Sequence, residues 1–208
     1  MTHPALRLLI ALAADGGPLR SPWPLERVGR HHLPEFCRSL GFKHGAEIGV
    51  WKGDYSALCC KTAPAMHMLC VDPWASYPEW KDGKHHPDEA QRFMDEAHAE
   101  AVAKLKGLNA TICRKFSADA AADVPDASLD FVYIDGNHSY AAATQDLELW
   151  VPKVKRGGIA AGHDCKVFPL KPYIKVLQAV TDYTEAHGIS PWFTTAADKT
   201  PSFLWIAQ

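Results

Sequence analysis

The chain has 208 residues, of which 47% are hydrophobic and 22% are charged, and its formal net charge at pH 7 is −2. A chain of this length suits one domain that buries a substantial core. The nearly neutral balance excludes a global attraction to nucleic acid or to an anionic membrane. No stretch approaches the roughly 20 apolar residues that a membrane span needs, so we expect a soluble, cytoplasmic protein.

The N-terminal part of the chain, residues 1–40, is expected to form a helical preface to the main domain, residues 41–208. Its apolar stretch ALRLLIALAADGG contains Arg7 within it, which favours an amphipathic helix over a signal peptide. None of the six cysteines forms a CxxC pair, and several lie inside apolar runs. We therefore expect buried free thiols in a reducing compartment.

Strand and helix patterns alternate from residue 45 onward. The first are a strand over 46–50, a helix over 54–61 and a strand over 66–71. Residues 73–88 are an insertion rich in aromatic and histidine side chains, which could stack on a flat acceptor or pack as a surface subdomain. A helix over 87–106 follows, with Pro87 in its first turn and Gly107 after its end.

The second half continues the alternation with strands over 111–113, 129–134 and 159–162 and helices over 140–150 and 172–187. Two closing strands are expected over 192–195 and 202–206. Such alternation predicts a doubly wound, mostly parallel sheet with helices on both faces. Ligands of these sheets bind beyond the carboxyl ends of the strands, so functional residues should follow the strands directly.

Two motifs follow the first two strands of the domain. Glu47, Gly49 and Gly53 surround a strand-to-helix turn, where a ligand can approach the backbone and an acidic group suits a cation such as an ammonium. Asp72 ends the next strand and is placed to accept the hydroxyls of a ribose. The alternatives are a glycine-softened turn with a surface glutamate and an aspartate that caps its own turn.

Two further motifs follow the strands over 129–134 and 159–162. Asp135 and His138 lie in IDGNHSY, and His163 and Asp164 lie in GGIAAGHD. The carboxyl ends of neighbouring parallel strands meet at one edge, so we expect these four side chains to lie together. Histidines with purely structural hydrogen bonds are the alternative for both His138 and His163.

Taken in order, these four motifs resemble a class I S-adenosylmethionine-dependent methyltransferase, and most closely methyltransferase family 24, over about residues 40–206. The resemblance implies a Rossmann-like, seven-stranded sheet with an antiparallel last strand. It implies S-adenosylmethionine as cofactor, held by Glu47, Gly49 and Gly53 at its methionine part and by Asp72 at its ribose, with Asp135 at the edge of the site. Ser117, Ala118 and Asp119 would lie beside the adenine.

Two mechanisms stay open for the strand-end cluster. In one, Asp135, His163 and Asp164 hold a divalent cation such as Mg²⁺ or Mn²⁺, as in the similar catechol-type O-methyltransferases, and His138 takes the proton. In the other, a histidine is the general base without a metal, and Asp135 or Asp164 orients it. Asn137 replaces the aspartate that is usual in relatives, and His163 suits borderline metals better than Mg²⁺.

The function expected is therefore methyl transfer to a hydroxyl of a small molecule or glycan, without a nucleic acid or membrane partner. A methyltransferase-fold binding or regulatory protein without turnover is the alternative. A nicotinamide-dependent oxidoreductase is a weaker alternative, because the Gly-x-Gly-x-x-Gly fingerprint is missing. A homo-oligomer stays open.

Overall fold

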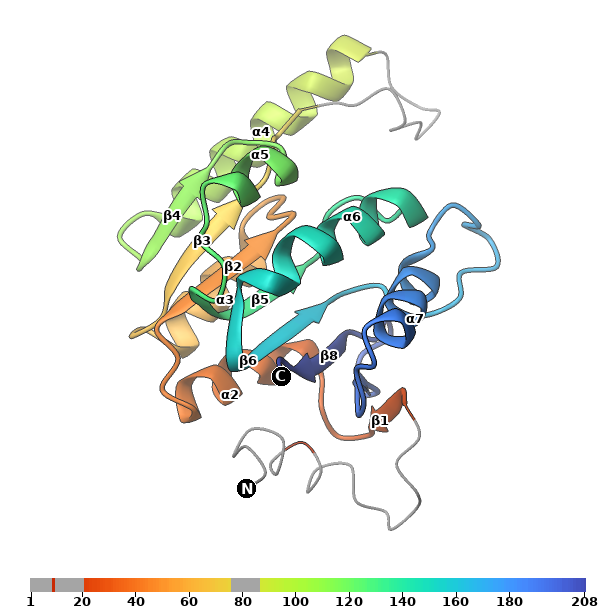
Figure 1. Cartoon of the computed structure of the whole chain (residues 1–208). Helices are drawn as coiled ribbons and strands as arrows, with labels where there is room; N and C mark the ends of the chain where they lie inside the picture. The colour runs from red at the N-terminus through yellow and green to blue at the C-terminus, as the bar shows by residue number, and fades with distance from the viewer. Residues whose placement is uncertain (1–8, 10–20, 76–86) are drawn as a thin grey trace.

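The computed structural model describes residue 9, residues 21–75 and residues 87–208, and every statement on the fold refers to these (Figure 1). Within them the strands form one eight-stranded sheet in the order β1-β7-β8-β6-β5-β2-β3-β4. Their bounds are β1 (Trp23–Leu25), β2 (His44–Ile48), β3 (His67–Val71), β4 (Ala110–Cys113), β5 (Leu129–Ile134), β6 (Val154–Gly162), β7 (Phe193–Thr195) and β8 (Phe203–Ile206).

The helices of the described residues alternate with these strands. They are η1 (Arg30–His32, a 3-10 helix), α2 (Leu33–Ser39), α3 (Asp54–Thr62), α4 (Pro87–Leu105), α5 (Ser117–Ala122), α6 (Tyr140–Trp150), η2 (Val151–Lys153, a 3-10 helix) and α7 (Val176–Ala186). All paired strands run parallel except β8, which is antiparallel to both β6 and β7. The predicted sheet with an antiparallel last strand is confirmed, and β1 adds an eighth strand parallel to β7.

The core consists of two apolar layers, one on each face of the sheet. Alternation along β5 separates them: Phe131 and Tyr133 pack with α2, α3 and α4, whereas Val132 and Ile134 pack with α5, α6 and α7. A strand covered on both faces needs apolar residues at every position, which is why β5 is an unbroken apolar run after Asp130. The predicted placement of helices on both faces is confirmed.

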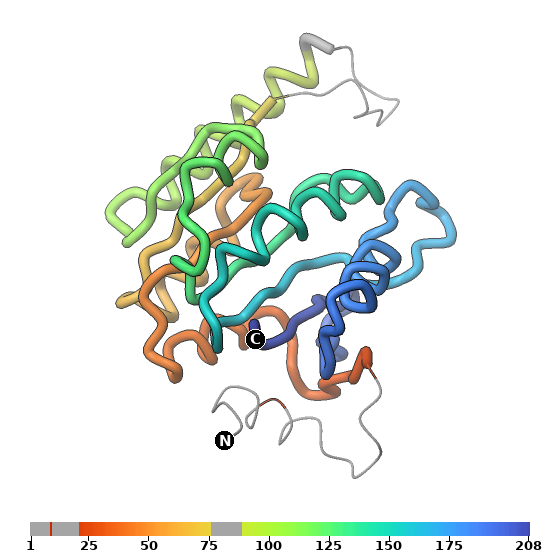
Figure 2. Tube along the Cα trace, viewed as in Figure 1, coloured from red at the N-terminus to blue at the C-terminus, as the bar shows by residue number. Residues whose placement is uncertain are grey.

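Residues 1–40 were expected to be a helical preface, and the described residues 21–40 are part of the main sheet and its core. They contain α2, but β1 joins the sheet beside β7, and Leu25, Leu33 and Cys37 are fully buried in the layer that holds α3. Figure 2 shows this red segment next to the blue C-terminal part of the chain. The amphipathic helix expected over residues 5–17 lies almost wholly outside the described residues.

Two element boundaries differ from the sequence-based prediction. The last helix begins at Val176 rather than near residue 172, because its buried face of Val176, Ala179, Val180 and Tyr183 starts there while Tyr173 is exposed. Strand β6 begins at Val154 rather than at residue 159, and Gly157 lies inside it with a φ of 87° where the register against β5 shifts. The strand thus contains a local bulge.

Backbone hydrogen bonds beyond the regular ladder lock the strand ends together. Gly49 donates to Val71, Asp135 donates to Ile48 (2.7 Å) and His163 donates to Ile134 (2.9 Å). The ends of β3, β2, β5 and β6 therefore form a continuous edge. Figure 1 shows the start of α6 and the connection from β6 to α7 beyond that edge, on the same side of the molecule.

All six cysteines are free in the structure, five of them buried and Cys113 partly so. This agrees with the expected free thiols. In the part of the chain that the structure describes, no helix is both long and apolar enough to cross a membrane.

Candidate active site

Some side chains of the IDGNHSY motif stabilise the turn before α6, and others face the candidate site. The Asn137 Oδ1 atom accepts a hydrogen bond from the Ser139 amide (2.9 Å), and the Ser139 hydroxyl caps α6 by accepting from Ala142 (3.3 Å). Asparagine and serine at a helix N-terminus satisfy amides that lack a partner in the first turn. Asp135 and His138 are left to face the end of β6.

There the four predicted side chains come together. The His138 Nε2 atom is in direct contact with Asp164 Oδ2 and lies 3.7 Å from Asp135 Oδ1. The His163 Nδ1 atom lies 3.7 Å from Asp135 Oδ1 and 3.6 Å from Asp164 Oδ2. Asp164 adopts a φ of 55°, a backbone conformation that is uncommon outside glycine and is often found at functional sites.

The cluster shifts the proton affinity of its members. Burial by itself would lower the pKa of His138, but the carboxylates of Asp135 and Asp164 outweigh it and raise that pKa to about 9. Burial would raise the pKa of Asp164, yet His138 and His163 together hold it well below its usual range. In the geometry described, His138 and Asp164 therefore form a charged pair at neutral pH.

The donor atoms of this cluster fit a divalent cation. Among the described residues, Asp135, His138 and Asp164 form the group whose ligand atoms all lie within 4.8 Å of one another. Two carboxylates and one imidazole suit Mn²⁺ and similar metals. His138 thus replaces His163 in the expected set of metal ligands, and His163 lies beside the same two carboxylates.

The glycines of the first motif serve close packing of the backbone. Gly49 has a φ of 91°, and a Cβ atom there would lie 2.2 Å from the carbonyl oxygen of Asp135. Gly53 has a φ of 78°, and its Cβ atom would lie 3.1 Å from the Cα atom of Ala101 in α4. Gly49 therefore brings the ends of β2 and β5 together, whereas Gly53 allows α3 and α4 to approach.

Glu47 lies beneath this turn rather than at its surface. Its side chain is 2% exposed and accepts a hydrogen bond from the Ser56 hydroxyl. Burial raises its pKa to about 8, with a smaller opposing effect of Ser56. Glu47 is therefore mostly neutral at pH 7, unlike the open carboxylate expected for an ammonium group.

Asp72 organises the turns on either side of it. Its Oδ2 atom accepts from the amides of Val50 and Trp51 (both 2.9 Å), and its Oδ1 atom accepts from the amide of Trp74 (2.7 Å). A carboxylate offers about four acceptor positions, so one stays available to a ligand. Trp74 is fully buried, with its indole N–H bonded to Trp51, while residues 76–86 of the insertion, with Tyr77, Trp80, His85 and His86, lie outside the described residues.

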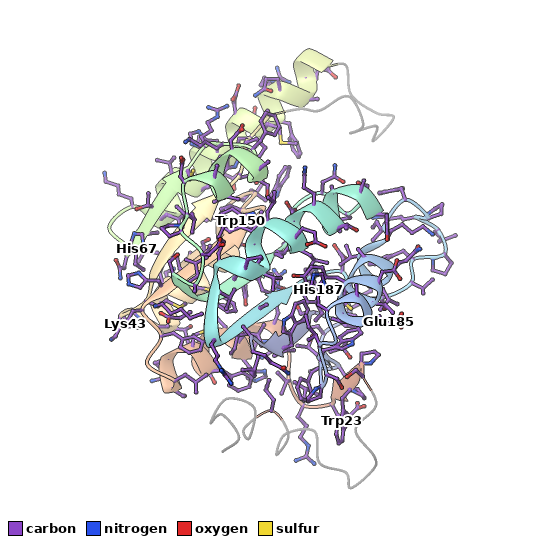
Figure 3. The ribbon with its side chains drawn as sticks, in the orientation of Figure 1. Trp23, Lys43, His67, Trp150, Glu185 and His187 are labelled. Carbon is purple, nitrogen blue, oxygen red and sulfur yellow. The ribbon has the colours of Figure 1, made fainter. Side chains whose placement is uncertain are left out.

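The start of α5, which follows β4, is tied to α6 by a residue that the sequence-based prediction missed. Ser117 donates to Asp146 Oδ1 (2.5 Å) and accepts from the indole of Trp150 (2.8 Å), a residue labelled on α6 in Figure 3. Asp146 is 5% exposed, and burial raises its pKa to about 6. Ala118 and Asp119, in contrast, are exposed. An acidic residue on the apolar face of α6 was the signal that could have identified Asp146.

Arg30 is the second missed residue, and it reaches the site from η1. Its Nη1 atom lies 3.6 Å from Asp135 Oδ2, and its guanidinium lies 5.2 Å from the ring centre of Tyr55. The sequence carried no signal for this placement, because nothing local indicates which strand end η1 will contact.

A pocket opens directly beside the cluster. It is lined by Ile134, Asp135, Gly136, Asn137, His138, Ala143, Leu147, His163, Val176, Val180 and Phe203. Its apolar side chains are contributed by α6, α7 and the two strands β5 and β8, whereas its polar groups are those of the strand ends. The pocket therefore joins apolar side chains to the polar groups of Asp135 and the two histidines.

The same fold occurs in known structures. Cofactor-bound Rv0187 from MTB is similar with a TM-score of 0.63 at 12% identity, over 99% of this chain and 90% of that one. The O-methyltransferase TomG from Streptomyces achromogenes, solved in complex with SAM, is similar with a TM-score of 0.62 at 12% identity, over 100% of this chain and 91% of that one. The fold is that of the class I S-adenosylmethionine-dependent methyltransferases.

The family follows from the sequence itself. The model of the methyltransferase domain of family 24 matches residues 46–165, and the chain belongs to this family. An uncharacterized protein, y4gI of Sinorhizobium fredii (strain NBRC 101917 / NGR234), is 34% identical over 158 residues. That match covers 71% of this chain and 16% of the other protein, so the chain spans only a small part of the length of this relative.

Proposed function

We propose that the chain transfers the methyl group of S-adenosylmethionine to a hydroxyl oxygen of a small molecule or glycan. The observation that carries this proposal is the cluster of Asp135, His138, His163 and Asp164 at the ends of β5 and β6, beside an apolar pocket. Methyl transfer to oxygen needs a hydroxyl held in line with the methyl group and a base for its proton.

The two histidines have different roles in this proposal. Asp135, His138 and Asp164 would hold a divalent cation, whose chemistry is to lower the pKa of a bound hydroxyl. His163 accepts the hydroxyl proton at its imidazole, which Asp135 and Asp164 orient from 3.7 Å and 3.6 Å. In the metal-free alternative a histidine is again the base, oriented by Asp135 or Asp164; His163 fits this role, because His138 is charged in its pair with Asp164.

For the cofactor, we propose the edge from β3 to β5. Asp72 retains one acceptor position for a ribose hydroxyl. The turn from Gly49 to Gly53 would lie along the methionine part, with Glu47 supporting it from below through Ser56. The exposed Ala118 and Asp119, next to Ser117, would flank the adenine. The domain boundary proposed is residue 21 onward, since β1 belongs to the sheet.

The first experiment is calorimetric titration of S-adenosylhomocysteine into the purified chain. Micromolar binding is expected, and an Asp72→Asn variant should bind more weakly. Because Asp72 also holds three backbone amides, the melting temperature of the variant is measured in parallel. No binding by the wild-type chain would overturn the proposed function.

The second experiment separates the two mechanisms without requiring turnover. Binding of Mn²⁺ is followed by electron paramagnetic resonance in the wild-type chain, in Asp164→Asn and in the control Asp126→Asn, whose exposed carboxylate pairs with Lys153. We expect binding to be lost only in Asp164→Asn. Absence of Mn²⁺ binding in the wild-type chain would favour the metal-free mechanism. Cofactor binding without turnover on any hydroxylated acceptor would favour a binding or regulatory protein.

A further inference from the structure

Arg30 contacts the reactive cluster from the side opposite to the histidines. Asp135 presents its Oδ1 atom to His138 and His163, while its Oδ2 atom faces the Arg30 guanidinium at 3.6 Å. The arginine comes from η1, far from β5 in the chain, so its position depends on the tertiary structure.

The backbone of Arg30 is held firmly in this position. Its amide donates to Asp198 Oδ2 (2.5 Å), and its carbonyl accepts from the Tyr55 hydroxyl (3.3 Å). The Tyr55 ring also lies under the guanidinium, and the Asp198 carboxylate is itself bonded to Thr195 (3.2 Å). An arginine anchored at its backbone and its ring contact is preorganised to bind a ligand.

The guanidinium nevertheless keeps hydrogen-bonding capacity. It carries five N–H donors, and its side chain is 35% exposed. Its distance to Asp135 exceeds a hydrogen bond, and among the described residues no other carboxylate forms an ion pair with it. Burial lowers its pKa, but Tyr133 and Asp135 outweigh this effect, so Arg30 stays charged.

The charges at the site favour an acceptor that carries a negative group. Asp135 and Asp164 contribute two negative charges, and Glu47 is buried and mostly neutral. Arg30 and the sulfonium of a bound cofactor already balance these two charges. A divalent ion held by Asp135 and Asp164 would make the site positive before an acceptor enters.

The loop over residues 165–175 adds positive charge at the same edge. It contains Lys166, Lys171 and Lys175 and no acidic residue. The Lys166 Nζ atom bonds to the carbonyl of Lys199, next to Asp198, and the amide of Lys175 bonds to the carbonyl of His138. The segments that hold Arg30 and His138 are thus connected by a basic loop.

We propose that Arg30 binds an oxyanion, a carboxylate or a phosphate, on the methyl acceptor. The acceptor is then a hydroxylated organic anion whose hydroxyl meets the histidines while its acidic group pairs with the guanidinium. This inference rests on the proposed function, since it names the acceptor class of the same site. The competing explanation is that Arg30 only balances the charge of Asp135.

The experiment compares three matched probes: 4-hydroxybenzoate, 4-hydroxyphenyl phosphate and the neutral 4-hydroxybenzamide. Each is titrated calorimetrically into the chain with and without saturating S-adenosylhomocysteine. At least one anion should bind about tenfold more tightly than the amide, as a charge-assisted, two-point hydrogen bond implies. The stronger of the two anions identifies carboxylate or phosphate as the preferred group.

Three variants test whether Arg30 causes the preference for the anionic probes. In Arg30→Gln the anion and the amide should bind equally, and in Arg30→Lys part of the preference should remain because charge is kept and the two-point geometry is lost. Arg27→Gln, an exposed arginine of the same segment, should retain the full preference. Melting temperatures show whether each variant is folded, and Arg30→Lys carries the comparison if Arg30→Gln is not.

The outcomes separate the explanations. Equal binding of all three probes by the wild-type chain, or no binding of either anion, overturns the inference. An equal loss for all three probes in Arg30→Gln shows that the arginine is only a counter-charge, and also overturns it. If S-adenosylhomocysteine fails to bind, the proposed function fails, while the anion preference is still measured by the titrations without it.

Discussion

Gly49 shows how a single residue can join the two halves of the site. Its φ is positive, and a Cβ atom at this position would lie only 2.2 Å from the Asp135 carbonyl oxygen, which leaves no space for a side chain. Since Asp135 directly follows β5, the residue that shapes the turn after β2 also sets the position of the end of β5.

We expect Gly49→Ala to destabilise the chain by about 2–5 kcal/mol. Left-handed backbone strain accounts for about 1–2 kcal/mol and overpacking for about 1–3 kcal/mol. Gly107→Ala is the matched control, because Gly107 has a φ of 77° but nothing within 4 Å of its Cβ position. The Gly107→Ala variant should be destabilised only by the backbone strain. Denaturant unfolding measures both, and equal losses would contradict the role of the Asp135 carbonyl.

At the scale of an element, the N-terminus of α6 holds the segment with Asp135 and His138 in place. Ser139 caps the helix and Asn137 closes the turn before it, so His138 lies between two residues with structural roles. The orientation of His138 therefore depends on a local turn as well as on Asp164.

Ser139→Ala should cost about 1 kcal/mol of unfolding free energy, the usual loss of a serine cap. Ser39→Ala is the control, since the exposed Ser39 hydroxyl only bonds back to the Glu35 carbonyl within α2. That variant should change stability by no more than about 0.5 kcal/mol. Urea unfolding of both variants tests this, and a cost for Ser139→Ala no larger than that of the control would show that the cap contributes little.

At the scale of the whole molecule, buried acids and a paired histidine set the pH dependence of folding. Burial raises the pKa of Glu47 to about 8 and that of Asp146 to about 6, while the neighbouring carboxylates, against the opposing effect of burial, raise the pKa of His138 to about 9. A group whose pKa is raised by folding contributes stability below its unfolded value and loses it as pH rises through the folded value. All three losses fall between about pH 4 and pH 9.

We therefore expect the free energy of unfolding to decrease from pH 5.5 to pH 8.5. A two-unit shift such as that of Asp146 corresponds to about 3 kcal/mol at most. The lowered pKa of Asp164 acts in the opposite direction, but only in more acidic solution. Denaturant unfolding across this range measures the slope, which Glu47→Gln and Asp146→Asn should each reduce. A flat or rising profile in the wild-type chain would contradict these shifts.

Much of the fold could be predicted because its signals are local. The apolar run of β5 and the spacing of Val176, Ala179 and Val180 identify a buried strand and an amphipathic helix without tertiary information. Strand β1 was missed because three residues, one of them Pro24, carry no periodicity. It exists because β7 offers a partner and Leu25 can be buried.

The candidate site was predictable to the same extent. Polar residues directly after apolar strands identified Asp135, His138, His163 and Asp164, because parallel strands end at one edge. The sequence could not show that Glu47 would be buried against Ser56, or that Asp72 would hold three amides. Both depend on how closely the turns pack.

By itself, then, the amino-acid sequence determined the order of strands and helices, the family and the residues at the strand ends, since these follow from periodicity and from motifs read along the chain. Only the tertiary structure decided that His138 contacts Asp164, that Asp146 supports Ser117, and that Arg30 lies beside Asp135. Side-chain contacts between distant segments depend on packing in three dimensions, and no local pattern encodes them.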